Sequence, residues 1–204
     1  MTTLDAPTAA LVRLAARIGL GGEGALAERA RALLELGAPR IWGDELLLQS
    51  ILMVGYPRSL VAAGVWRHLV GLPADAEEDG TDWAQLPSWR ARGEDLCRTI
   101  YGANYEKLRR NVADLHPAID GWMVVEGYGR TLARPGLDLV RRELCVIAQV
   151  TVLRAERQLH SHLRGALHAG AGRPLVDAAL EAIRPEVGDE GVAFAGAIWA
   201  KVGG

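Results

Sequence analysis

Three of the five histidines lie close together, at His160, His162 and His168. Histidine takes or gives a proton near neutral pH, because its ordinary pKa is about 6.5. Side chains two residues apart on a helix point about 200° apart, so His160 and His162 cannot readily bind one metal ion. Glu156 and His160 share a helix face, but two ligands make a poor metal site. The cluster therefore predicts one histidine facing inward, its neighbours at the surface, and no bound metal.

Glu143 follows two arginines, Arg141 and Arg142, at the start of an apolar helical segment. The positive end of the helix dipole favours a carboxylate there, which would be a purely structural role. Alternatively, the carboxylate faces a cleft, and the arginines beside it bind an anionic substrate. The residues alone leave both interpretations open.

Two further patterns have structural explanations. Cys97 and Cys145 are far apart in helical segments, and two cysteines are too few for a disulfide framework or a thiolate zinc site, so we expect buried, apolar thiols. Residues Gly19–Gly24 match the G-x-G-x-x-G pattern of dinucleotide sites. That pattern needs a strand before it, whereas a helical segment precedes it here, so it predicts a turn between helices.

The elements that must position these residues are helical. Apolar residues recur at spacings of three and four along most of the chain, and no strand-like alternation is found. We therefore predict an all-α fold of about ten helices. Residues 72–88 are acidic, contain proline and glycine, and lack periodicity, which predicts a linker. Trp83 and Trp89 suggest that this linker packs against the surface.

An internal repeat is indicated by an offset of 133 positions, which aligns residues 9–71 with 142–204 without a gap. The Gly-Ala turn at Gly37 falls on the one at Gly170, and Trp66 falls on Trp199. Glu143 and His162 fall on Ala10 and Arg29, so the polar pair exists only in the second copy. We expect a degenerate first repeat (1–71), the linker, and a segment with the second repeat (89–204). The two repeats would pack about a pseudo-twofold axis within one compact domain.

Composition excludes several classes of protein. The 204 residues are 50% hydrophobic and 24% charged, which is too apolar for a mainly disordered chain. The net charge of −2 offers no basic excess for a nucleic-acid partner. No run of about 18 apolar residues predicts a membrane span. The first residues do not have the pattern of a signal peptide, so we expect a cytoplasmic location.

Residues 126–183 carry a specific pattern. Its matching positions are Tyr128-Gly129, Arg134-Pro135-Gly136-Leu137-Asp138, Arg142-Glu143-Leu144, Gln158-Leu159, His162 and Gly165-Ala166. The pattern resembles the carboxymuconolactone decarboxylase family. In that family a Y-x-G-x-P element follows the motif, whereas here the similar Met53–Pro57 precedes it. The chain therefore resembles a permuted or internally duplicated member.

The resemblance implies an all-helical alkylhydroperoxidase D-like fold, no cofactor, a homo-oligomer, and a small-molecule substrate. It implies proton transfer with loss of carbon dioxide from a carboxylated lactone or a related carbonyl compound. His162 would be the catalytic acid–base and Glu143 its catalytic partner. Arg134 and Arg142 would bind the substrate carboxylate, and Tyr56 would wall the pocket.

Two alternatives accompany this reading. The first is a non-catalytic ligand-binding or structural oligomer on the same scaffold. The second is the similar alkylhydroperoxidase D branch, in which a histidine also follows the glutamate by nineteen residues. Its two cysteines fall here on Ala155 and Gln158, so the redox dithiol is absent and peroxidase chemistry is disfavoured.

The sequence does not by itself predict contact between Glu143 and His162. If the turn between their helices lies at residues 154–156, the two residues stand at heights of about 17 and 10 Å from it. If the two helices packed as a simple antiparallel pair, the Glu143 and His162 side chains would not touch. A steep crossing of the helices, a water molecule or a substrate would have to bridge them.

Overall fold

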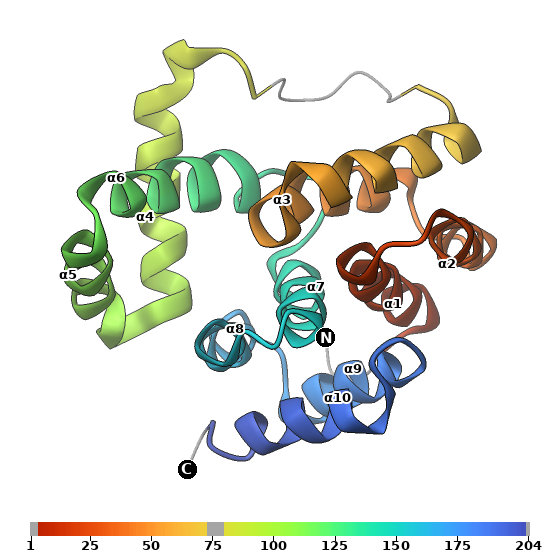
Figure 1. Ribbon diagram of the computed structural model, residues 1–204. Coiled ribbons are helices and arrows are strands. Elements are labelled where there is room, and N and C mark those ends of the chain that lie inside the picture. Colours follow the sequence, from red (N-terminus) through yellow and green to blue (C-terminus); the bar gives the residue numbers. More distant parts are fainter. Residues whose placement is uncertain (1–3, 73–79, 203–204) are drawn as a thin grey trace. The chain divides into compact units, whose positions relative to one another are not determined.

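A computed structural model describes residues 4–72 and 80–202. Within these ranges the chain forms helices and no β-strand, which confirms the predicted all-α class (Figure 1). The elements are α1 (Ala6–Leu20), α2 (Glu23–Glu35), α3 (Arg40–Val70), the 3₁₀ turn η1 (Trp83–Gln85), α4 (Leu86–Tyr101), the 3₁₀ turn η2 (Gly102–Asn104), α5 (Tyr105–Leu115), α6 (Pro117–Trp122), the π-helix η3 (Met123–Leu132), α7 (Leu139–Val152), α8 (Glu156–His168), α9 (Arg173–Ala182) and α10 (Arg184–Trp199).

The chain divides into two compact units, where the sequence predicted one domain. Unit 1 comprises Met1–Ala74 with Gly136–Gly204, and unit 2 is Asp75–Pro135. The predicted linker 72–88 is partly helical, because η1 and the first turn of α4 occupy its end. Its residues 73–79 lie outside the described ranges.

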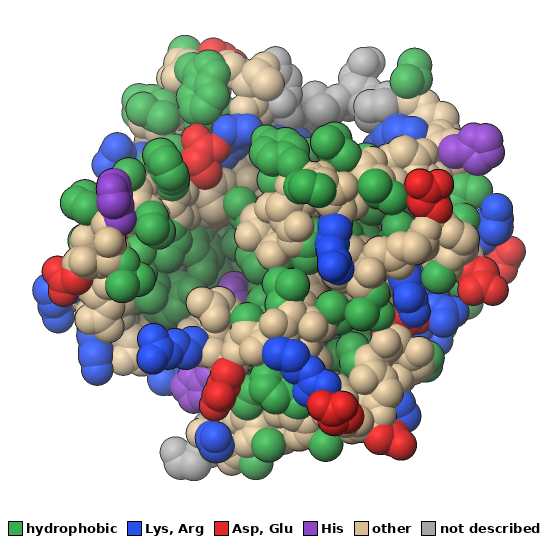
Figure 2. Space-filling model, in the orientation of Figure 1, with side chains coloured by type: hydrophobic (Ala, Val, Ile, Leu, Met, Phe, Trp, Pro, Cys, Tyr) green, Lys and Arg blue, Asp and Glu red, His purple; other side chains and the backbone are tan. Residues whose placement is uncertain are grey.

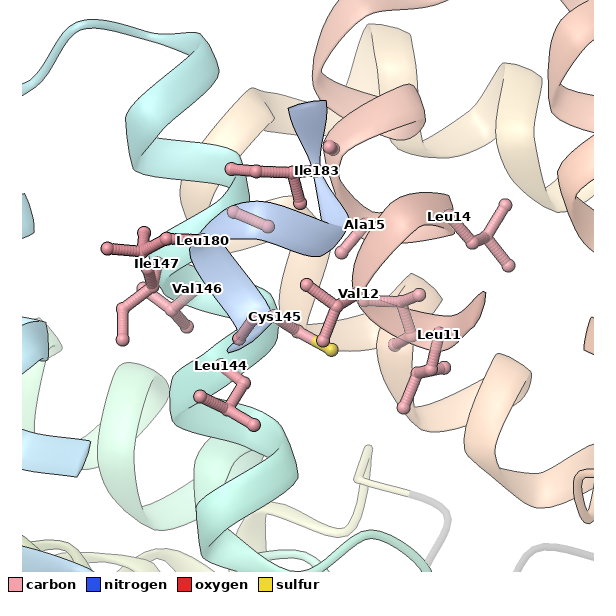
Figure 3. Packing of buried hydrophobic residues seen from close by; sticks show 14 of the residues in the cluster. Leu11, Val12, Leu14, Ala15, Leu144, Cys145, Val146, Ile147, Leu180 and Ile183 are labelled. Carbon is pink, nitrogen blue, oxygen red and sulfur yellow. The ribbon is translucent and has the colours of Figure 1, made fainter. Parts of the chain in front are cut away.

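The core of unit 1 is built on α1 and α7. Each helix begins at an aspartate whose carboxylate accepts a hydrogen bond from a backbone N–H three residues on, Asp5 from Thr8 and Asp138 from Arg141. Such caps satisfy backbone groups that would otherwise be unpaired at a helix start. Figure 3 shows the buried apolar side chains that α1, α7 and the α9 region contribute to one cluster: Leu11, Val12, Leu14, Ala15, Leu144, Cys145, Val146, Ile147, Leu180 and Ile183.

α1 and α7 contact each other at positions that the 133-residue offset relates. Near the helix starts, the Arg141 Nε donates to Thr8 Oγ1 at 2.9 Å. Near their ends, a Cβ on Gly19 would lie 3.1 Å from Val152 Cγ1. The start of α1 contacts the start of α7, and the end of α1 contacts the end of α7. The two helices therefore run parallel to each other.

Other local structures recur at the same offset. The Trp66 indole donates to Asp44 at 2.7 Å, and the Trp199 indole donates to Asp177 at 2.6 Å. α3 and α10 are both broken at a glycine of positive φ, Gly55 at 73° and Gly188 at 68°. The duplication itself stays a prediction, and these recurrences support it.

The glycine-rich segment between α1 and α2 is a turn, as predicted. Gly21 and Gly22 have φ of 84° and 87°, and α2 begins at Glu23. Such angles are easily adopted only by glycine, so the pattern is explained by chain reversal between helices.

α3 is long and apolar enough, by length and composition alone, to cross a membrane. Its break at Gly55 divides it into two straight parts of about 22 Å each, whereas the hydrocarbon core of a bilayer is about 30 Å thick. Its first part also carries the buried polar side chains of Glu45 and Gln49. These features favour a helix of a protein core over a membrane span.

In unit 2, α4 and η3 approach closely through two glycines. A Cβ on Gly129 would lie 1.8 Å from the Trp89 carbonyl oxygen, and one on Gly93 would lie 2.2 Å from the Val124 carbonyl oxygen. Trp89 is buried, whereas Trp83 is 59% exposed. Figure 2 shows hydrophobic side chains at the surface over the start of α4.

The Arg-Pro-Gly-Leu-Asp segment of the motif brings the chain into α7. Gly136 has φ of 90°, and a Cβ there would lie 2.6 Å from Ile41 Cγ1 and 3.2 Å from Glu45 Cγ on α3. The next residues are the buried Leu137 and the capping Asp138. This part of the motif therefore positions the start of α7.

Replacing Gly136 with alanine is expected to lower the free energy of unfolding by about 2 kcal/mol, because it combines an unfavourable φ with a collision against α3. Urea unfolding followed by circular dichroism measures the change. Gly24→Ala is the control, because Gly24 lies in α2 with open space around it. The control variant should leave the free energy of unfolding unchanged or raise it by about 0.5–1 kcal/mol. Equal effects of the two substitutions would contradict the prediction.

Candidate functional site

Glu143 and His162 are in direct contact in unit 1. The His162 Nδ1 and Glu143 Oε2 atoms lie 2.9 Å apart. Only 1% of the Glu143 side-chain surface and 8% of the His162 side-chain surface are exposed. Apolar side chains next to them on both helices are fully buried, including Leu144 and Leu163. The structure therefore holds a hydrogen-bonded glutamate–histidine pair among buried residues of unit 1.

The sequence-based estimate of their separation was too large. The connection between α7 and α8 is only Leu153–Ala155, with Arg154 at φ 54°. Glu143 lies nine residues before the end of α7, and His162 lies six residues after the start of α8. The corresponding heights are about 14 and 9 Å, a difference that two long side chains span.

The hydrogen bond defines which nitrogen of His162 is available for chemistry. A carboxylate accepts hydrogen bonds, so Glu143 orients the ring with its proton on Nδ1. This arrangement leaves Nε2 with a lone pair that can accept a proton from a bound molecule. The second oxygen of Glu143, Oε1, is buried and has no hydrogen-bond partner among the described residues.

Arg142, which was predicted to bind a substrate carboxylate, contacts buried protein groups, and its role toward a substrate stays a prediction. Its side chain is 1% exposed, and its Nη2 lies 2.8 Å from Glu45 Oε2 on α3. Its Nε donates to the Leu137 carbonyl oxygen at 3.0 Å, and its Nη1 donates to Gln49 Oε1 at 3.3 Å. The Gln49 amide in turn donates to the Arg142 carbonyl oxygen at 3.3 Å. This buried network joins α3 to α7 at the residue before Glu143.

The other two predicted binding residues differ from the pair in burial or in unit. Tyr56 follows the break in α3 and is 61% exposed, whereas Glu143 is fully buried. Arg134 belongs to unit 2, where it is 9% exposed and its Nη1 lies beside Gly80. Their roles toward a substrate stay predictions.

Sequence reasoning missed Glu45 and Gln49. Both are buried on α3, one helical turn apart, inside a strongly apolar stretch. Two polar residues on the same face of such a helix are a signal of a buried partner, because an unpaired charge is costly there. The identity of that partner, 97 residues away, could not be read from spacing.

The cysteines do not form a reactive thiol site. Burial raises the pKa of the Cys97 thiol to about 12, and it also raises the pKa of the Cys145 thiol strongly. A thiol that stays protonated at neutral pH is a poor nucleophile. The described residues contain no group of three or more side chains suited to a metal ion.

The cap of α7 is electrostatically favourable. Although burial alone would raise the pKa of Asp138, hydrogen bonds from the Arg141 backbone and side chain hold that pKa below its ordinary value. The carboxylate is therefore charged at neutral pH, where it completes the helix start five residues before Glu143.

Residues 121–201 match the model of the carboxymuconolactone decarboxylase family. A search among curated proteins finds no match. The matched segment contains the Arg-Pro-Gly-Leu-Asp turn and both helices of the Glu143–His162 pair. The match covers about two fifths of the chain, and the segment that holds the candidate site is similar to the carboxymuconolactone decarboxylase family.

Proposed function

We propose that the chain is a cofactor-free enzyme that moves a proton on a small carboxylated lactone or a related carbonyl compound. His162 is the acid–base in this proposal, and Glu143 orients it. The family match supports the general chemistry, and the geometry of the pair supports the roles of the two residues.

The observation that carries the proposal is the buried pair with an unpaired oxygen. Leaving a buried polar atom without a partner costs about 1–3 kcal/mol. Glu143 Oε1 is such an atom within the described part of the chain. A bound molecule or a water molecule can supply the missing partner of such an atom, and Glu143 Oε1 lies on the carboxylate that contacts His162.

The reaction would proceed by loss of carbon dioxide and protonation of the remaining carbon. The bond between the carboxylate carbon and the ring breaks, and its electron pair moves into the conjugated lactone carbonyl. Protonated His162 then delivers a proton to the ring carbon from Nε2. Glu143 stabilises the charged imidazole during this cycle, because it accepts the Nδ1 hydrogen bond.

A panel of small lactone acids and their open-chain carbonyl analogues tests the proposal. Released carbon dioxide and the mass of each product are measured with the purified chain. Turnover of at least one lactone acid is the expected result. Tight calorimetric binding of panel members without any turnover would instead favour a non-catalytic binding protein.

The second candidate function is a non-catalytic ligand-binding or structural oligomer. The exposed apolar side chains of unit 2 favour an assembly, with Leu115 77% exposed and Trp122 65% exposed. A groove of about 480 Å³ beside them is lined mainly by apolar residues. A homo-oligomer is compatible with either function, and light scattering well above the 21.9 kDa of one chain would demonstrate it.

A further inference from the structure

In unit 1 an ion cluster joins α10 to α1 and α2, and it includes the position that the 133-residue offset relates to His162. Arg29, which is 133 residues before His162, forms an ion pair with Glu186. Arg17 forms a second ion pair with the same carboxylate. The Glu186 side chain is fully buried, and it precedes the break of α10 at Gly188.

The same offset relates Glu186 to Met53. Met53 precedes the break of α3 at Gly55, as Glu186 precedes the break at Gly188. Glu186 of α10, two residues before the break, therefore contacts the side chain of α2 at the position related to His162. The recurring caps, breaks and Trp–Asp hydrogen bonds indicate that the other half is arranged in the same way.

Contacts between α3 and α7 agree with a position of Met53 near His162. Arg142 contacts Gln49 at the start of α7, and the Gln149 amide donates to Ser50 Oγ at 2.6 Å farther along. Met53 lies less than one turn beyond Ser50 and is partly buried against the core of unit 1. α3 therefore contacts α7 at both Arg142 and Gln149 through residues less than two turns before Met53.

We propose that Met53 lies over the Glu143–His162 pair and forms the apolar wall of the substrate site. This inference rests on the proposed function and extends it, because it assigns a residue to substrate specificity. A methionine there excludes water and contacts the uncharged ring of a small carbonyl compound. At the related position, Glu186 instead closes the space over Arg29 with an ion pair, so only one half of unit 1 keeps a site.

A charge at position 53 tests the placement without any enzyme assay. Met53→Glu would recreate at His162 the ion pair that Arg29 makes with Glu186. A carboxylate within about 6 Å changes the electrostatic field at the ring, so the His162 imidazole NMR signals should move at constant pH in Met53→Glu and not in the control. His162→Gln identifies the signal by its loss. Leu52→Glu is the matched control, because Leu52 is the neighbouring residue and is 37% exposed.

If Met53→Glu does not fold, a milder variant provides a second test. Met53→Ala removes the cover and should increase the rate at which diethyl pyrocarbonate modifies His162, whereas Leu52→Ala should not. Equal effects at positions 52 and 53, or no effect at either, would overturn the inference. Because neither readout needs a substrate, these results are independent of whether the proposed function is correct.

Discussion

Replacing Glu45 with alanine is expected to lower the free energy of unfolding by about 3–5 kcal/mol. The Arg142 guanidinium is 1% exposed, and Glu45 lies 2.8 Å from it. Removing the carboxylate leaves a buried positive charge without the anion that faces it, and water cannot replace that anion inside the core. Urea unfolding monitored by circular dichroism measures the loss.

Two controls separate this charge effect from a loss of packing. Glu190→Ala removes an ion pair with Arg154 in which the glutamate is 90% exposed, and it should leave stability nearly unchanged. Replacing both partners, Glu45→Leu with Arg142→Met, should restore most of the stability, because no unpaired charge remains. A double variant as unstable as Glu45→Ala would show that the ion pair is not the cause.

Replacing His162 with glutamine is expected to lower turnover of the substrate found in the lactone panel by about 10²- to 10⁴-fold. Glutamine retains an N–H group that can donate to Glu143 Oε2, but it cannot take up or deliver a proton near neutral pH. It is a cleaner test than alanine, because alanine would leave the buried Glu143 carboxylate without its hydrogen bond. Steady-state kinetics measure the loss, and the helical circular dichroism should be retained.

The matched control is His160→Gln, two residues earlier on α8. His160 lies on a different side of the helix from His162, and it is partly exposed. This variant should keep the turnover of the parent protein. Full activity in His162→Gln would remove the pair from the mechanism, and equal losses at both positions would indicate a general effect on α8.

The helical class, the turn at Gly21 and one inward-facing histidine in the cluster at 160–168 were all predictable from sequence. Periodicity and glycine placement are local properties, and the structure follows them. The contact of Glu143 with His162 was implied by the family resemblance. Spacing alone overestimated the separation, because the short connection at Leu153–Ala155 depends on one residue, Arg154, with a positive φ.

The role of Arg142 could not be predicted in the same way. Arginine binds a substrate carboxylate and a protein carboxylate through the same hydrogen bonds, so its type does not reveal its partner. That partner, Glu45, lies 97 residues away on another helix. The division into two units was equally hidden, because Gly136 returns the chain to unit 1 after an apolar, helical segment that resembles the rest.

The contacts between α1 and α7 could not form if the two halves of unit 1 had identical sequences and an exact twofold axis between these helices. Each position would then meet the same residue type across the axis. Here Gly19 faces Val152, and Thr8 accepts a hydrogen bond from Arg141. Identical halves would pair glycine with glycine, which leaves a void, or valine with valine, which would collide. At the other contact two arginines would face and repel each other. With both halves in one polypeptide, each half can be fitted to the other, and a change on one side need not be repeated on its counterpart.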